Sequence, residues 1–81
     1  MARFVIENIN FNAEVSPSRY TSKYPISEDD AYLALFNEQK KLEAKGWAIV
    51  DTFNTGLCDG IQMSTIASDG IAYHCELFVR L

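Results

Sequence analysis

The sequence is poor in the side chains that hold metal ions, since it has one histidine and two cysteines, Cys58 and Cys75. A structural zinc site draws on more cysteine and histidine ligands than this, so we do not expect one. Two thiols without a secretory signal are expected to be reduced and independent of each other. We therefore expect no metal ion and no cofactor.

Long apolar runs are also missing. No stretch approaches the roughly 20 apolar residues that cross a bilayer, and the first residues lack the apolar core of a signal peptide. The net charge is −4, and the acidic residues are scattered apart from Glu28–Asp30. A domain that binds nucleic acid would carry a basic stripe instead. We expect a cytoplasmic protein that contacts no membrane, and nucleic acid is not an expected partner.

Motifs of known catalytic sites are absent, including glycine-rich phosphate loops and paired histidines on a helix. The strongest candidate set is Ser64, His74 and Glu76, because serine, histidine and a carboxylate can form a nucleophile system. Two residues along a strand, however, Glu76 projects parallel to His74 and does not orient its ring. We interpret His74 as an exposed strand histidine and predict that the protein is not an enzyme.

The clearest structural signal is one amphipathic helix. Ser27 is a favoured N-cap residue, and the carboxylates of Glu28–Asp30 follow where the helix dipole is positive. Gly46 is expected to end the helix in a left-handed conformation, with Leu42 and Trp47 in the apolar contact of a Schellman motif. The helix face predicted to be buried consists of Ala31, Tyr32, Leu35, Phe36 and Leu42.

Alternating and β-branched residues predict four strands, which span residues 3–15, 47–54, 61–67 and 71–81. In the first strand the alternation changes phase near Glu7, which indicates either a bulge or burial of the first residues on both faces. Residues 55–60, which contain Cys58, are expected to form a turn. The predicted fold is a single α+β domain, residues 1–81, with one helix packed on a four-stranded, mainly antiparallel sheet in the order β-α-β-β-β.

Residues 61–81 are expected to form a hairpin, and the apolar pattern decides its register. A two-residue Asp-Gly loop would place Met63 opposite Glu76. A three-residue loop places Met63 opposite Cys75 and pairs apolar with apolar residues throughout. Because register follows the buried face, we predict the three-residue loop, with Gly70 in a left-handed conformation.

One helix can cover only one face of a sheet. In the last strand the odd-numbered residues are expected to face the helix, so Phe78 faces away from it, and Val50 and Ile66 are expected on the same uncovered face. Apolar side chains left without cover favour contact with another chain. Val50, Ile66 and Phe78 therefore predict an oligomer face, most simply a homodimer interface.

The connection over residues 16–25 is the one locally basic and aromatic segment. Long loops are more often functional, and tyrosine beside arginine is typical of binding surfaces. Alternatively, the tyrosines pack over the helix start and the charges keep the loop solvated. Leu33 lies off the buried helix face and is either singly exposed or a partner contact. The predicted partner-binding residues are Arg19, Tyr20, Lys23, Tyr24 and Leu33.

Residues 42–50, LEAKGWAIV, resemble the L-x-x-x-G-W-x-hydrophobic-V signature of several short bacterial and phage families. In those families a first strand precedes a helix, and Gly-Trp is followed by a hairpin. The residue after the tryptophan is commonly acidic there, whereas it is Ala48 here. The resemblance implies the fold and carries over no activity. Dodecins, which bind flavin as oligomers, share only the order of strand, helix and hairpin.

These features predict a small acidic interaction protein of phage or mobile-element type that binds and occludes a partner protein, as an inhibitor does. The alternative is a homo-oligomer that binds a small aromatic ligand between sheet faces through Phe78, Tyr73 or Trp47.

Overall fold

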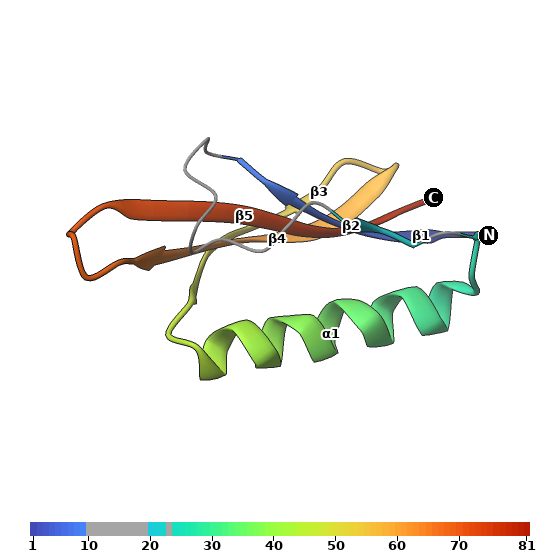
Figure 1. Cartoon of the computed structure of the whole chain (residues 1–81). Coiled ribbons are helices and arrows are strands. Elements are labelled where there is room, and N and C mark those ends of the chain that lie inside the picture. The colour runs from blue at the N-terminus through green and yellow to red at the C-terminus, as the bar shows by residue number, and fades with distance from the viewer. Residues whose placement is uncertain (10–19, 23) are drawn as a thin grey trace.

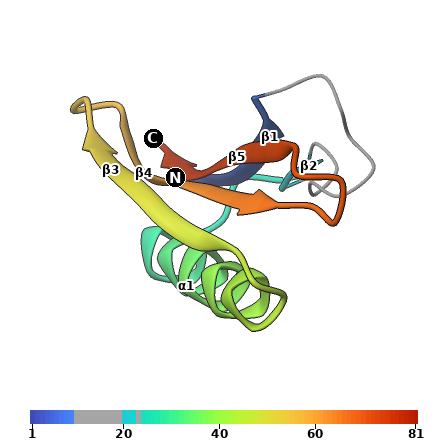
Figure 2. The same cartoon turned by 90° about the vertical axis from the view of Figure 1, so that its left-hand side faces the viewer.

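The computed structural model describes residues 1–9, 20–22 and 24–81, and it places one helix against an antiparallel sheet (Figure 1). The elements are β1 (Arg3–Asn8), β2 (Tyr20–Thr21), α1 (Glu28–Ala44), β3 (Ala48–Asn54), β4 (Cys58–Ile66) and β5 (Ala72–Arg80). The sheet order is β2-β1-β5-β4-β3, with β2 and β3 at the edges (Figure 2). The predicted α+β class with one helix is therefore confirmed.

The sheet has five strands, not the four predicted. The additional strand is β2, which lies in the segment expected to be only a connection and pairs with Val5 and Ile6 of β1. Ser22 fixes this edge, because its hydroxyl accepts a hydrogen bond from the Phe4 N–H (3.2 Å) and its own N–H donates to the Phe4 carbonyl (2.9 Å). Two residues of pairing thus add a strand that no local pattern indicates.

The structure describes β1 as Arg3–Asn8, and residues 10–15 of the predicted first strand lie outside the described residues. The pairing of β1 with β5 is uninterrupted, so the bulge considered near Glu7 is absent. Phe4, Val5 and Ile6 are consecutive buried residues. Within β1 these residues are therefore buried on both faces of the sheet, which was the alternative.

Both ends of α1 form as the sequence predicts. The Ser27 hydroxyl accepts a hydrogen bond from a first-turn N–H at 3.2 Å. At the other end the Trp47 N–H donates to the Leu42 carbonyl (3.0 Å) and the Gly46 N–H donates to the Glu43 carbonyl (3.1 Å), with Gly46 at φ +94°. These two bonds define a Schellman motif. Across the described ranges, no helix combines the length and hydrophobicity needed to cross a bilayer.

The β4–β5 hairpin has the predicted register. Met63 lies opposite Cys75, and the Ala67 N–H donates to the Ile71 carbonyl at 3.0 Å across the three-residue loop. Gly70 has φ +83°, the left-handed conformation that this loop requires.

Three residues predicted to lie in the turn after β3, residues 58–60, belong to β4 instead. The Thr55 N–H donates to the Cys58 carbonyl at 3.0 Å, so the turn closes early and Cys58 begins the strand. Gly60 is a strand residue whose Cα lies close to the backbone of β5. A Cβ atom there would lie 2.6 Å from both the Leu77 carbonyl oxygen and the Phe78 Cβ. Gly60 is therefore required by packing and not by a turn.

The core lies between α1 and the facing side of the sheet. The odd-numbered residues of β5 from Tyr73 to Val79 are buried there, as predicted, together with Leu35, Leu42 and Trp47. Phe36 was expected to join them but is 52% exposed. The helix packs against β5 and β1, so the side of α1 that carries Phe36 points toward the edge strand β3.

Strand β3 is an irregular edge. Its pairing with β4 shifts between Ile49 and Asp51, which leaves Val50 at the irregularity. Ile49 and Thr52 lie opposite the core residues Met63 and Ile61, so both are on the helix side of the sheet.

Candidate functional site

A groove with a volume of about 450 Å³ runs between α1 and β3. Its lining includes Tyr32, Phe36 and Gln39 from the helix and Ile49, Thr52 and Ile61 from the sheet. We call this the α1–β3 groove. Its volume falls within the range of roughly 300–1,000 Å³ that is usual for binding pockets.

The groove is apolar and open because of where the helix sits. Tyr32 and Phe36 are four residues apart on α1 and therefore share one side of the helix. Ile49 is 44% exposed and Phe36 is 52% exposed, although both lie on the inner side of their elements. The sheet thus presents apolar side chains that α1 does not cover.

One end of the groove is acidic. The Tyr32 hydroxyl donates a hydrogen bond to Asp59 Oδ2 at 2.8 Å. This hydrogen bond, together with burial and the negative charges of Asp59 and Glu28, raises the pKa of Tyr32 above its usual value. Asp59 lies opposite Asn54, and Asn54 is two residues beyond Thr52 along β3. The groove therefore combines an apolar stretch with a carboxylate at one end.

A second groove of about 460 Å³ lies on the other side of the helix, next to β1. Its lining includes Phe4, Ile6 and Tyr20 of the sheet with Ala34, Asn37 and Lys41 of the helix. The Tyr20 and Phe4 rings pack with their centroids 6.1 Å apart. Two charged residues, Glu38 and Lys41, line this second groove, whereas Asp59 is the one charged residue among those lining the α1–β3 groove.

The three predicted partner-binding residues that the structure describes are exposed and lie on different elements. Tyr20 is 51% exposed in β2, Tyr24 is 68% exposed before the helix, and Leu33 is 58% exposed on α1 without lining either groove. Arg19 and Lys23 lie outside the described residues. Their role in binding stays a prediction.

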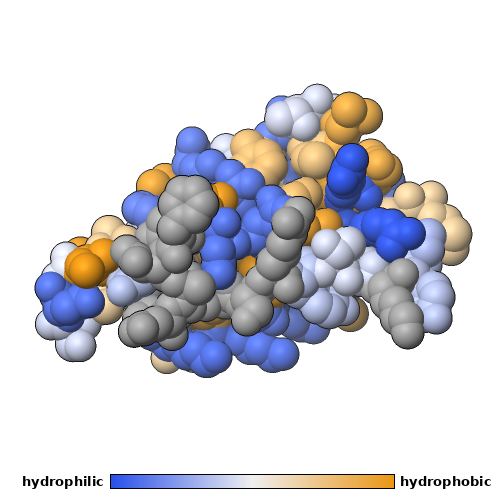
Figure 3. All heavy atoms as spheres, turned by 45° about the horizontal axis from the view of Figure 1, so that its top comes forward, coloured by the Kyte–Doolittle hydropathy of each residue, from blue (hydrophilic) through white to orange (hydrophobic). Residues whose placement is uncertain are grey.

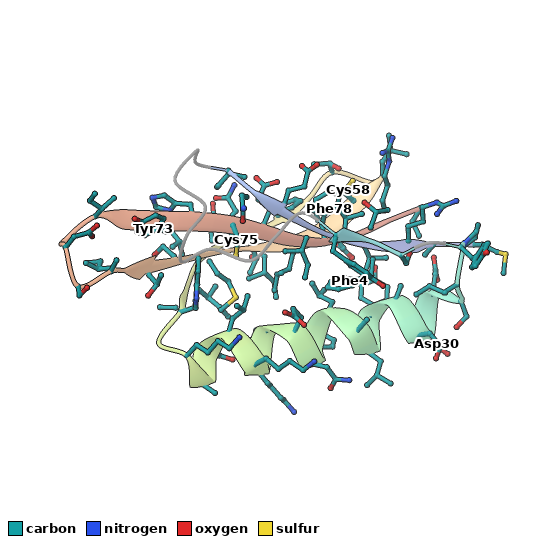
Figure 4. All side chains as sticks on the ribbon, in the orientation of Figure 1. Phe4, Asp30, Cys58, Tyr73, Cys75 and Phe78 are labelled. Atoms are coloured by element: carbon teal, nitrogen blue, oxygen red, sulfur yellow. The ribbon has the colours of Figure 1, made fainter. Side chains whose placement is uncertain are left out.

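The predicted oligomer residues lie on the face away from α1 or at its edge, but they are separated. Phe78 lies opposite Gly60, and Ile66 lies opposite Ala72, so the two side chains are about 20 Å apart at ~3.3 Å per residue. Figure 4 shows Phe78 pointing away from the helix and Phe4 pointing toward it. Hydrophilic side chains occupy the middle of this face in Figure 3, with apolar ones toward its ends. A homodimer interface here stays a prediction.

The aromatic residues considered for a small ligand have different positions. Trp47 and Tyr73 are 5% and 4% exposed in the core. Phe78 is partly exposed on the opposite face, where its ring lies 6.3 Å from that of Phe53. The three rings therefore do not share a surface.

The polar set on the far face is arranged differently from a catalytic triad. Ser64 lies opposite His74, as predicted. The Glu76 carboxylate, however, accepts a hydrogen bond from Gln62 Nε2 at 3.0 Å across the strands. The carboxylate thus bonds to an amide of β4, and no described contact joins it to the imidazole.

The two cysteines are free thiols, as predicted. Cys75 is fully buried and burial raises its pKa to about 11, with the negative charges of Glu38 and Glu76 adding to the effect. Cys58 is partly exposed at the start of β4. Within the described part of the chain, no group of three or more histidine, cysteine or acidic residues is placed to hold a metal ion.

Sequence reasoning missed the residues that form the α1–β3 groove. Phe36 was predicted to be buried, and Tyr32 and Asp59 are joined across 27 residues of sequence. No family model matches the chain, and no curated protein or solved structure matches it significantly. The groove is therefore argued from its own geometry.

Proposed function

We propose that this chain is a small, non-catalytic binding protein that acts by occupying a surface of a partner protein. The observation that carries the proposal is the α1–β3 groove, where Phe36 and Ile49 remain exposed beside an acidic end. Exposed apolar patches that polar residues border mark interaction sites in soluble proteins. The scattered positions of Tyr20, Tyr24 and Leu33 favour the groove over the residues that the sequence singled out.

The chemistry of the groove supports binding over catalysis. Its polar side chains are a phenol hydrogen-bonded to a carboxylate (Tyr32 and Asp59), the amides of Gln39 and Asn54 and the hydroxyl of Thr52. Gln39 Nε2 in turn donates to Glu43 at 3.2 Å. A nucleophile activated by an adjacent base is not part of this set. Glu76, on the other face of the sheet, accepts a hydrogen bond from Gln62.

A pull-down from bacterial lysate with three forms of the protein tests the proposal. Phe36→Ser removes the exposed ring from the groove, and Leu33→Ser removes a similarly exposed apolar side chain from the same helix outside it. We expect mass spectrometry to identify a protein that the wild type and Leu33→Ser retain and that Phe36→Ser loses. Circular dichroism confirms that each variant is folded.

The opposite patterns contradict the proposal. If Leu33→Ser loses the partner and Phe36→Ser keeps it, the surface is the solvent side of α1. If Tyr20→Ala and Tyr24→Ala lose it instead, the segment before the helix is the binding surface. If nothing is retained, sedimentation distinguishes a homodimer from a monomer, and loss of dimer mass in Phe78→Ser would assign the far face.

A further inference from the structure

The α1–β3 groove has two parts in a fixed order. Ile49 and Thr52 lie on the helix side of β3, and the apolar part consists of Ile49, Phe36 and Ile61, which lies opposite Thr52. Asn54 follows on the same side, opposite Asp59. Along an extended strand, two residues span about 6–7 Å. The Asp59 carboxylate therefore lies one such two-residue spacing beyond the Thr52–Ile61 pair, measured along β3.

The acidic end carries negative charge, and its carboxylates form no ion pair among the described residues. Asp59 is partly buried and accepts from the neutral Tyr32 hydroxyl at 2.8 Å. Glu28 lies one helical turn before Tyr32, and its charge acts on the same phenol. The described ion pair of α1 joins Lys41 to Glu38 at 3.9 Å, beside the other groove. Between described residues, no ion pair joins Asp59 or Glu28 to a lysine or arginine.

Building on the proposed function, we infer that the α1–β3 groove binds an extended segment of a partner protein with the pattern apolar-x-Lys/Arg. The apolar side chain packs against Phe36 and Ile61, level with Thr52. Two residues on, the cation meets the Asp59 carboxylate, because alternate side chains of an extended segment lie on one face at the spacing that the groove presents. The chain's net charge of −4 favours such a basic segment over an acidic one.

Three matched heptapeptides test this pattern, each acetylated and amidated within a glycine-serine frame. The first contains Leu-Ser-Lys, the second Leu-Ser-Glu and the third Gly-Ser-Lys. Each is titrated to millimolar concentration into the 15N-labelled full chain, with amide shifts recorded by NMR. We expect the Leu-Ser-Lys peptide to shift the amides of Ile49, Thr52 and Ile61. The Leu-Ser-Glu peptide should bind about two- to fivefold more weakly, as an exposed ion pair allows, and the Gly-Ser-Lys peptide should shift none of them.

Protein variants separate the charge of Asp59 from its structural bond. Asp59→Asn keeps an oxygen that can accept from Tyr32 but removes the charge, so it should bind the Lys and Glu peptides equally. Asp69→Asn removes the same charge at the hairpin loop, at the far end of β4, and should preserve the preference. Phe36→Ser should abolish the shifts for every peptide.

Equal affinity of the wild type for the Lys and Glu peptides overturns the inference, as does the absence of shifts at groove residues. The proposed function is tested separately. If the pull-down finds a partner through Phe36 while the peptides show no charge preference, the function stands and the inferred pattern fails. If the peptides discriminate as expected but no partner is captured, the pattern stands and the proposed function fails.

Discussion

Replacing Gly60 by alanine tests the close packing near the start of the β4 strand. The added Cβ would lie 2.6 Å from the Phe78 Cβ, whereas directly opposed residues in an antiparallel pair normally hold their Cβ atoms about 4.5–5.5 Å apart. It would also lie 2.6 Å from the Leu77 carbonyl oxygen and would meet the Phe53 ring. Alanine at this position therefore requires the sheet itself to move.

The expected loss follows from two opposing terms. Overpacking a well-packed site costs about 1–3 kcal/mol. Replacing glycine lowers the entropy of the unfolded chain and returns about 0.4–1 kcal/mol. We expect Gly60→Ala to lose about 1–2 kcal/mol of unfolding free energy, which corresponds to a decrease in Tm of roughly 5–15 °C for a domain of this size.

Urea unfolding monitored by fluorescence measures this loss, because Trp47 is the single tryptophan and is buried in the core. Ser64→Ala is the matched control, since Ser64 lies on the same face of β4 and already carries a Cβ. In a Phe53→Ala background, Gly60→Ala should still lose most of this unfolding free energy relative to Phe53→Ala alone. The Phe53 ring can rotate away from an added Cβ, whereas the Leu77 carbonyl cannot. A Gly60→Ala variant within about 0.5 kcal/mol of the wild type, the usual range for neutral surface changes, would refute the reasoning.

Further tests concern the helix cap and the thiols. Ser27→Ala should lower the unfolding free energy by about 1 kcal/mol because it removes the N-cap acceptor, while Ser68→Ala in the hairpin loop should change it little; urea unfolding checks both. In the native protein a thiol reagent should label Cys58 quickly and Cys75 only after unfolding, and mass spectrometry of the peptides reads the ratio; equal rates would contradict the burial of Cys75. Because burial raises the pKa of Cys75 from 9.0 to about 11, the unfolded chain loses this proton first as the pH rises. Unfolding free energy should therefore fall between pH 9 and 11, by about 2–3 kcal/mol in total. Cys75→Ala should lack this part of the pH dependence, and an unchanged slope in that variant would contradict it.

The elements that the sequence predicted are those with local causes. The Ser27 cap and the Schellman motif at Gly46 depend on residues within one turn of each helix end. The hairpin register depends on apolar residues that alternate on both sides of a short loop ending in Gly70. Rules of capping, turn geometry and strand alternation are sufficient in these places.

The features that sequence analysis missed have non-local causes. Tyr20–Thr21 is a strand only because it pairs with β1, which precedes it by more than ten residues. In the sequence Gly60 resembles a turn glycine, because its role depends on how closely β5 packs against it. Phe36 fits the apolar face of α1 on a helical projection, but its exposure depends on the helix lying over β5 and β1. The same placement creates the α1–β3 groove, so no linear motif could indicate it.

The sheet order has a consequence for how the chain acquires its structure during synthesis. The strand Ala72–Arg80 lies between β1 and β4 and supplies the fully buried residues Cys75, Leu77 and Val79. Until it leaves the ribosome, the helix has only part of its supporting surface and β1 lacks its main partner. Before that point the earlier elements are incompletely packed and expose apolar side chains. A nascent chain stalled before residue 72 would therefore depend on chaperones to avoid aggregation.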